Sequence, residues 1–158
     1  MTERRKPVNI RKPAGYSNLF SELDKLMTAQ PLQMELYYKI GRLVSGRAEK
    51  DATVIASEHL QTTYLAAEGV SPRNLRRMRA FYAVYEKSPE IMRLTMNIGW
   101  TQNVAILERC SSNEKEQAWY IRAVLRFGWK KTRLLEAIEY QVWLYSSPNE
   151  QVLSCYAE

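Results

Sequence analysis

The sequence predicts an all-α fold, a compact multi-helix domain that contains a helix-turn-helix-like unit. Apolar residues recur at helical spacing through most of the chain. The six glycines and six prolines fall mainly between these periodic segments. No pair of segments has the alternating pattern of paired strands. A chain of 158 residues that is 46% hydrophobic is long enough to bury a core without disulfides.

The first half of the chain predicts a basic arm followed by three helices. Residues 1–15 carry two prolines and no periodicity, and we expect them to form a flexible arm. A first helix is expected from about Ser17, and Pro31 either starts a second helix or kinks the first, with the apolar stripe ending near Gly46. A third is expected over residues 51–67, with its core face formed by Val54, Ile55, Leu60, Tyr64 and Leu65.

The clearest start signal in the chain opens the fourth predicted helix. Ser71 is a favourable N-cap, and Pro72 suits the first helical position, where the missing N–H has no partner to lose. This helix is expected to continue to about Lys87 and to stop before Pro89. A short segment over residues 89–96 follows it.

Three further helices are expected in the second half of the chain. Thr101 is placed to cap a helix that ends near residue 109. Ser111 and Glu114 have capping-box spacing for a helix that ends at Gly128. A last helix is expected from Lys131 to about residue 145. The helical domain would therefore occupy residues 16–146, with a C-terminal tail over residues 147–158.

Positive charge is concentrated in three segments. The formal net charge is +6, with 23 Lys and Arg against 17 Asp and Glu. Residues 1–12 carry a net charge of +4, residues 71–87 carry +4 and residues 122–133 carry +5, so the remainder carries −7. Segregated positive charge favours a polyanionic partner, although a single basic helix face is more often simply solvated.

Residues 52–86 have the proportions of a helix-turn-helix, with Gly69 in the connection. The helical wheel of the second helix predicts one buried face, formed by Leu75, Met78, Tyr82 and Tyr85. The first turns would then present long donors to a DNA groove, where arginine can bind guanine and asparagine can bind adenine. The predicted contacts are Ser71, Arg73, Asn74, Arg76 and Arg77, with Ser71 on a phosphate at the helix N-terminus.

The other two basic segments predict further phosphate contacts. In residues 122–133, aromatic residues interleave with basic ones, but Trp119 and Phe127 have core spacing, so only Lys130, Lys131 and Arg133 are candidates. Arg4 and Arg5 of the N-terminal arm could follow a groove or the phosphate backbone. An inert, solvated arm is about as common an outcome.

The sequence offers no recognisable catalytic or metal-binding constellation. His59, the single histidine, is interpreted as a structural residue, and Cys110 and Cys155 have no local partner that would mark a nucleophile. Neither a phosphate-binding glycine loop nor an acidic residue two positions before a lysine occurs. We therefore expect no catalytic residues, no metal, no cofactor and no membrane segment, and a cytoplasmic location.

Four stretches resemble the N-terminal domain of the bacterial YhcG family, catalogued as domain of unknown function 1016. They are residues 38–44 (YKIGRLV), residues 70–82 (VSPRNLRRMRAFY), the group Trp100, Asn103 and Leu107-Glu108, and the final group Trp119-Tyr120, Gly128-Trp129 and Leu134-Leu135-Glu136. Together they span about residues 19–145. Each stretch is weakly specific, but the combination is specific.

The resemblance implies a helical, DNA-binding-like module that precedes a PD-(D/E)XK nuclease domain in longer family members. This sequence ends at Glu158, so the chain is either a stand-alone relative or a fragment of a larger gene product, and we expect no nuclease site in it and a regulatory or targeting role. The expected partners are DNA, a separate nuclease or other protein, and a second copy of the chain. The alternative is a protein–protein interaction or assembly module without nucleic acid, suggested by ten tyrosines, four tryptophans and six methionines.

Overall fold

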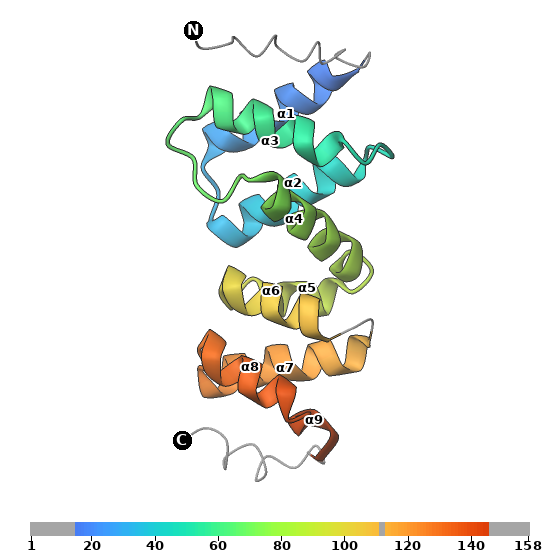
Figure 1. Ribbon diagram of the computed structural model, residues 1–158, viewed down its shortest axis with the longest axis vertical. Coiled ribbons are helices and arrows are strands. Elements are labelled where there is room, and N and C mark those ends of the chain that lie inside the picture. The colour runs from blue at the N-terminus through green and yellow to red at the C-terminus, as the bar shows by residue number, and fades with distance from the viewer. Residues whose placement is uncertain (1–14, 111–112, 146–158) are drawn as a thin grey trace, which may run out of the picture. The chain divides into compact units, whose positions relative to one another are not determined.

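The computed structural model describes residues 15–110 and 113–145 (Figure 1). Within these residues it contains nine helices and no strand, which confirms the all-α prediction. The helices are α1 (Tyr16–Ala29), α2 (Gln33–Ser45), α3 (Ala52–Thr63), α4 (Pro72–Tyr85), α5 (Pro89–Thr95), α6 (Trp100–Arg109), α7 (Glu114–Phe127), α8 (Lys131–Glu139) and α9 (Val142–Tyr145). The predicted basic arm and C-terminal tail lie outside the described residues, apart from Gly15.

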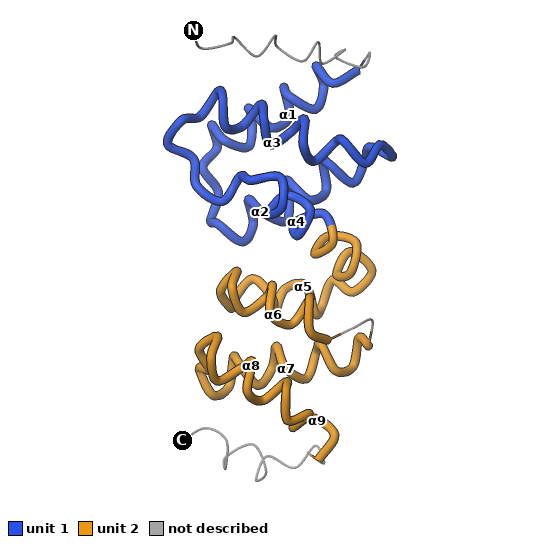
Figure 2. The backbone as a smooth tube through the Cα atoms, in the orientation of Figure 1, with its two compact units in different colours: residues 1–79 blue, residues 80–158 orange. Residues whose placement is uncertain are grey.

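The chain forms two compact units, and the boundary between them falls within α4 (Figure 2). Unit 1 comprises Met1–Arg79 and unit 2 comprises Ala80–Glu158. The sequence predicts a single helical domain over residues 16–146, and the structure resolves two bodies within that range. The first half of α4 therefore belongs to unit 1 and the second half to unit 2.

Unit 1 is built on a three-helix core in which α1 packs against α2 and α3, and α2 packs against α3. Apolar side chains from these helices and from the first half of α4 are buried in its core. The largest contributors are Tyr16, Leu19, Leu23, Tyr37, Ile40, Val44, Leu60, Leu75 and Met78.

The predicted core face of α3 is wrong at two of its five positions. Val54 and Leu65 are exposed, whereas small side chains fill the interface, namely Ala52, Thr53, Ala56 and Ser57 together with Leu60. Small residues allow neighbouring helices to approach closely, so the face that packs need not be the most hydrophobic one. Ser57 Oγ is satisfied in this interior because it donates to the Val70 carbonyl at 2.6 Å.

Unit 2 packs α7 against α5, α6 and α8, and α8 also against α6. Two buried amides tie its loops to its helices. The Asn103 side-chain nitrogen donates to the Thr95 carbonyl at 3.0 Å and the Gly99 carbonyl at 3.1 Å. The Gln117 side-chain nitrogen donates to the Cys110 carbonyl at 3.0 Å. Both side chains are buried, so these hydrogen bonds satisfy their amide N–H groups inside the unit.

Three predicted helix boundaries in unit 2 need correction. Thr101 lies inside α6, whose N-cap is Gly99, where the Gln102 side chain accepts from the Gly99 N–H. The N-cap of α7 is Asn113, because its side chain accepts from two backbone N–H groups of the first turn. The predicted helix over residues 131–145 is divided into α8 and α9, and Gln141 between them has a left-handed φ of 50°.

A glycine sets the approach to α4. Gly69 lies in the connection between α3 and α4 with φ +74°, a conformation that side chains of L-residues rarely adopt. A Cβ atom at this position would overlap the Tyr37 hydroxyl, which is held by a 3.3 Å hydrogen bond from Gln33. The backbone can therefore pass close to α2 only because residue 69 has no side chain.

We expect Gly69→Ala to lower the free energy of unfolding by about 2–4 kcal/mol, since left-handed strain and steric overlap add together. Chemical denaturation followed by circular dichroism measures the change. The control is the same substitution in a Tyr37→Phe background, where the overlapping hydroxyl is gone and the cost should fall to that of the backbone strain. Equal costs in the two backgrounds would contradict the predicted overlap.

Candidate nucleic-acid interface

The first half of α4 has one buried face and one basic face. Leu75 and Met78 are fully buried in unit 1. Arg73 and Arg76 are exposed and Arg77 is half-buried. These three arginines, at relative positions 0, 3 and 4, lie on one side of the helix and are called here the α4 arginine face. Because the apolar side chains fix the rotation of the helix, the arginines must point away from the core.

The N-terminus of α4 is closed by the two polar residues that the sequence singles out. Ser71 Oγ accepts from the Asn74 backbone N–H at 3.2 Å, so Ser71 caps the helix as predicted. The Asn74 side-chain nitrogen donates to the Gly69 carbonyl at 2.5 Å. Asn74 therefore braces the turn in this conformation. A hydroxyl that accepts a hydrogen bond still has a proton to donate, and Ser71 is exposed.

The fourth arginine of this helix has a structural position. Arg79 donates to the Arg47 carbonyl at 2.6 Å and to the Glu49 carbonyl at 3.4 Å. The Arg47 guanidinium in turn lies 4.0 Å from the centre of the Tyr16 ring. Arg79 thus links α4 to the α2–α3 loop and differs in role from the exposed arginines one and two turns earlier.

The connection between α3 and α4 comprises residues 64–71 and is longer than the three- or four-residue turn of a helix-turn-helix. It has no intervening helix and is held to unit 1 at Val70, whose side chain is buried. The pair α3 and α4 retains the order of a helix-turn-helix, with a basic second helix. Its use as one stays a prediction.

The remaining predicted contacts do not belong to the α4 arginine face. Lys130 and Lys131 are exposed in unit 2. Arg133 is half-buried, and its Nη1 lies 3.7 Å from Glu136 Oε2. Arg4 and Arg5 lie outside the described residues. The structure therefore places the five predicted α4 positions together in unit 1 and the three later ones in unit 2.

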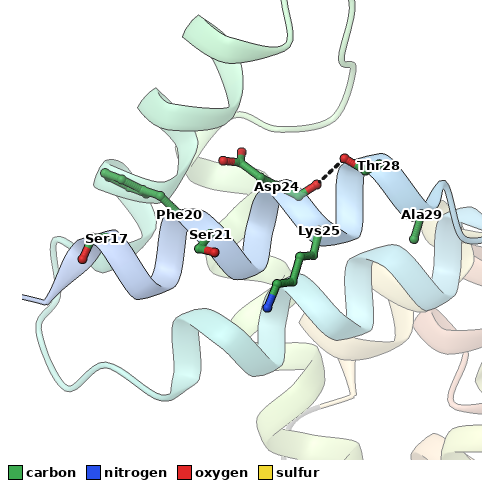
Figure 3. Close-up of a pocket in the computed structure, with 7 residues that line it drawn as sticks. All are labelled: Ser17, Phe20, Ser21, Asp24, Lys25, Thr28 and Ala29. Carbon is green, nitrogen blue, oxygen red and sulfur yellow. Dashed lines mark hydrogen bonds between the residues drawn. The ribbon is translucent and has the colours of Figure 1, made fainter.

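A pocket of about 700 Å³ lies along α1 (Figure 3). The seven residues that line it are Ser17, Phe20, Ser21, Asp24, Lys25, Thr28 and Ala29. Lys25 points away from the Asp24 carboxylate and pairs instead with Glu22 at 2.9 Å. Thr28 Oγ1 donates to the Asp24 carbonyl at 2.8 Å. Lys25 and Thr28 of this pocket are thus bonded within their own helix.

Asp24 accepts two hydrogen bonds from residues far away in the sequence. Its Oδ1 lies 2.8 Å from His59 Nε2 and 2.8 Å from the Tyr64 hydroxyl. The His59 ring also stacks on Phe20, with ring centres 4.2 Å apart. These hydrogen bonds lower the pKa of Asp24. Desolvation raises the pKa of Tyr64, and its hydrogen bond to Asp24 adds to that effect. His59 therefore has the structural role that the sequence predicts, with a carboxylate partner that no local motif reveals.

The described cysteine is unsuited to nucleophilic chemistry. Cys110 is fully buried, and burial raises the pKa of its thiol to about 12. At neutral pH it is therefore a thiol, which is the unreactive form. Within residues 15–110 and 113–145, no group of three or more metal-binding side chains comes together. Cys155 lies outside these residues.

An apolar groove of about 450 Å³ lies where the α1–α2 loop meets the chain that follows α3. No charged residue lines it, and Leu26, Met27, Leu36 and Tyr64 are among the residues of its wall. Leu65 on its rim is 90% exposed, and Leu32, beside the lining residue Pro31, is 82% exposed.

None of the helices in the described part of the chain has the length and apolar character required to cross a membrane.

The fold and the α4 arginine face define an all-α protein with exposed arginines on a capped helix. Residues 24–145 match the family model described as the DUF1016 N-terminal domain, and the chain belongs to that family. The match agrees with the resemblance in the four sequence stretches and covers most of both units. No curated protein and no solved structure matches the chain.

The lowered pKa of Asp24 predicts a pH-dependent contribution to stability. A carboxyl whose pKa is lower in the folded state stabilises the fold above its unfolded pKa of about 3.9, and the contribution is lost as pH falls through the folded value. We expect the difference in Tm between the native protein and Asp24→Asn to shrink as the pH is lowered from about 6 to about 3. Scanning calorimetry across this range measures it.

Tyr64→Phe is the matched control for the Asp24 experiment, because it removes one donor and keeps the carboxyl. In this variant the pKa of Asp24 should rise toward its ordinary value, which carboxyl NMR titration detects directly. A Tm difference between native protein and Asp24→Asn that does not change below about pH 4 would contradict the predicted linkage.

Proposed function

We propose that this chain is a DNA-binding helical module of the bacterial cytoplasm, regulatory or targeting in role, with no nuclease site of its own. The observation that carries the proposal is the α4 arginine face. Arg73 and Arg76 are exposed on the first two turns of a helix whose other side is fully buried. Neither arginine has an acidic partner among the described residues.

The contact chemistry follows from the geometry of α4. Arginine side chains can neutralise phosphates or bind guanine in a bidentate manner. Ser71 can donate its hydroxyl proton to a phosphate at the N-terminus of the helix, where backbone dipoles favour an anion. Asn74 acts first as a brace for the turn, through its bond to Gly69, and base contact by Asn74 would require that bond to break.

Membership of the DUF1016 N-terminal domain family is consistent with this role, since the sequence resemblance implies a targeting module for a nuclease domain. A nuclease on a separate chain is the protein partner that we propose. Lys130, Lys131 and Arg133, and Arg4 and Arg5 of the N-terminal arm, remain predicted phosphate contacts.

We expect Arg73→Ala combined with Arg76→Ala to weaken binding to a DNA duplex and to reduce its salt dependence. Each lost phosphate contact should lower the slope of log K against log salt by about 0.9. Fluorescence anisotropy with a labelled duplex at several salt concentrations measures the slope. The double variant should therefore lose about 1.8 units of slope if both arginines contact phosphates.

Lys25→Ala combined with Lys39→Ala is the matched control, because it removes the same charge from unit 1. These lysines lie on α1 and α2, where they pair with Glu22 at 2.9 Å and Glu35 at 2.7 Å. The control should change the slope much less. An α4 double variant that binds DNA with unchanged affinity and slope would refute the proposed interface.

The alternative function, a protein interaction module, is favoured by one specific observation. Leu32 and Leu65 project beside the uncharged apolar groove of unit 1, and exposed leucines next to such a groove are typical of protein contacts. This surface shares no residue with the α4 arginine face.

If unit 1 uses the groove for a protein contact, Leu32→Ser combined with Leu65→Ser should abolish that contact and leave the fold intact, since both side chains are already exposed. Light scattering after size exclusion tests a second copy as the partner, and a pull-down with a co-expressed nuclease tests a separate chain. Val54→Ser, at another exposed apolar position, is the control. If the double variant and the native protein give the same result in both assays, the interpretation as a protein interaction module is wrong.

A further inference from the structure

Unit 2 contains a short helical corner with a higher density of positive charge than α4. Helix α7 ends at Phe127 and α8 begins at Lys131, so three residues connect them. Gly128 supplies the left-handed conformation, with φ +64°, that ends α7. A three-residue turn that contains glycine has the length found in helix-turn-helix units, in contrast to the longer α3–α4 connection.

Four exposed basic side chains surround this corner. Arg122 and Arg126 lie four residues apart on α7, so their side chains are neighbours on one face. Lys130 is the N-cap residue of α8 and Lys131 is its first residue. No acidic residue occurs between Glu116 and Glu136. These four residues are called here the α7–α8 basic corner.

The corner is attached to a rigid base. Trp129, in the middle of the turn, is buried, and its carbonyl accepts from the Gln102 side chain at 2.6 Å. Its ring lies 5.6 Å from that of Phe127. On the first turns of α8, Leu134 is fully buried. Because the backbone is fixed, binding an anion would order only side chains, which limits the entropy lost on association.

Charge distribution favours the four residues of the α7–α8 basic corner as phosphate contacts over Arg133, which the sequence also predicts in this segment. Arg133 is half-buried and lies near Glu136, which partly neutralises it. Arg122, Lys130 and Lys131 have no acidic partner in the described part of the chain, and the Arg126 guanidinium lies 5.8 Å from the Phe127 ring. The positive charge without an acidic partner in this part of the chain is therefore centred on Arg122, Lys130 and Lys131.

We infer that the α7–α8 basic corner is a second phosphate-binding surface for duplex DNA, carried by unit 2 and separate from the α4 arginine face of unit 1. The inference rests on the proposed function in one respect, the choice of DNA as the polyanion. Both surfaces belong to one chain. Binding by one unit then raises the effective concentration of DNA at the other, so two modest surfaces give a tighter complex.

The test compares two double variants and their combination in the full chain. Arg122→Ala with Arg126→Ala removes the α7 half of the corner, and Arg73→Ala with Arg76→Ala removes the α4 arginine face. With a labelled duplex of about three helical turns, each pair should lower the slope of log K against log salt by about 1.8, and the quadruple variant by about 3.6. Arg122→Lys with Arg126→Lys should retain the native slope, because phosphate contact requires only the charge.

The matched control in unit 2 is Arg93→Ala with Arg109→Ala, which removes the same charge from exposed positions outside the corner. A loss of slope in the α7 pair and not in this control supports the inference. An unchanged slope in the α7 pair overturns it, and the proposed function stands if the α4 pair still loses slope. A loss in the α7 pair alone overturns the α4 interface and leaves the corner supported.

Two further outcomes would overturn the inference. Equal losses in the α7 pair and the control pair would mean that only overall charge matters. Vesicles with anionic headgroups provide the other comparison. If the α7 pair loses vesicle binding while its duplex binding is unchanged, the corner recognises a lipid surface and not DNA.

Discussion

The burial of Leu75 and Met78 is the constraint on which the rest of unit 1 depends. Both side chains are completely removed from solvent, which contributes about 1.5–3 kcal/mol each. Their spacing fixes the rotation of α4 about its axis, and this rotation sets the direction in which every other side chain of the helix points. The arginines at positions 73 and 76 are exposed for this reason, and they give the helix its basic face.

The polar contacts of unit 1 fix the ends of this helix and its neighbours. Ser71 caps α4, Asn74 holds the turn at Gly69, and Arg79 reaches the carbonyls of the α2–α3 loop. The bonds of Asn74 and Arg79 therefore tie the α3–α4 connection and the α2–α3 loop to α4. Donors that already have an acceptor within the protein brace the fold, and the other donors are the ones that can bind DNA.

Much of the fold could be predicted because helix periodicity and caps are local properties. The start of α4 at Pro72 and the end of α7 before Gly128 follow from residue types alone. The exposed arginines of the candidate interface follow from the same wheel. Prediction failed where the sequence signal is weak or where the interacting residues are far apart in the chain. The break at Gln141 occurs at a residue without special turn chemistry, and Asp24 and His59 are separated by 35 positions.

The sequence by itself determined the all-α class, the amphipathic division of α4 and the three basic segments, because each depends on residues within one or two helical turns of one another. Only the tertiary structure decided which face of α3 is buried, which polar groups are already bonded, and that the chain forms two units with the boundary in α4. Those features depend on contacts between residues far apart in the chain. The free energy of such contacts depends on packing and distance, which residue order does not specify.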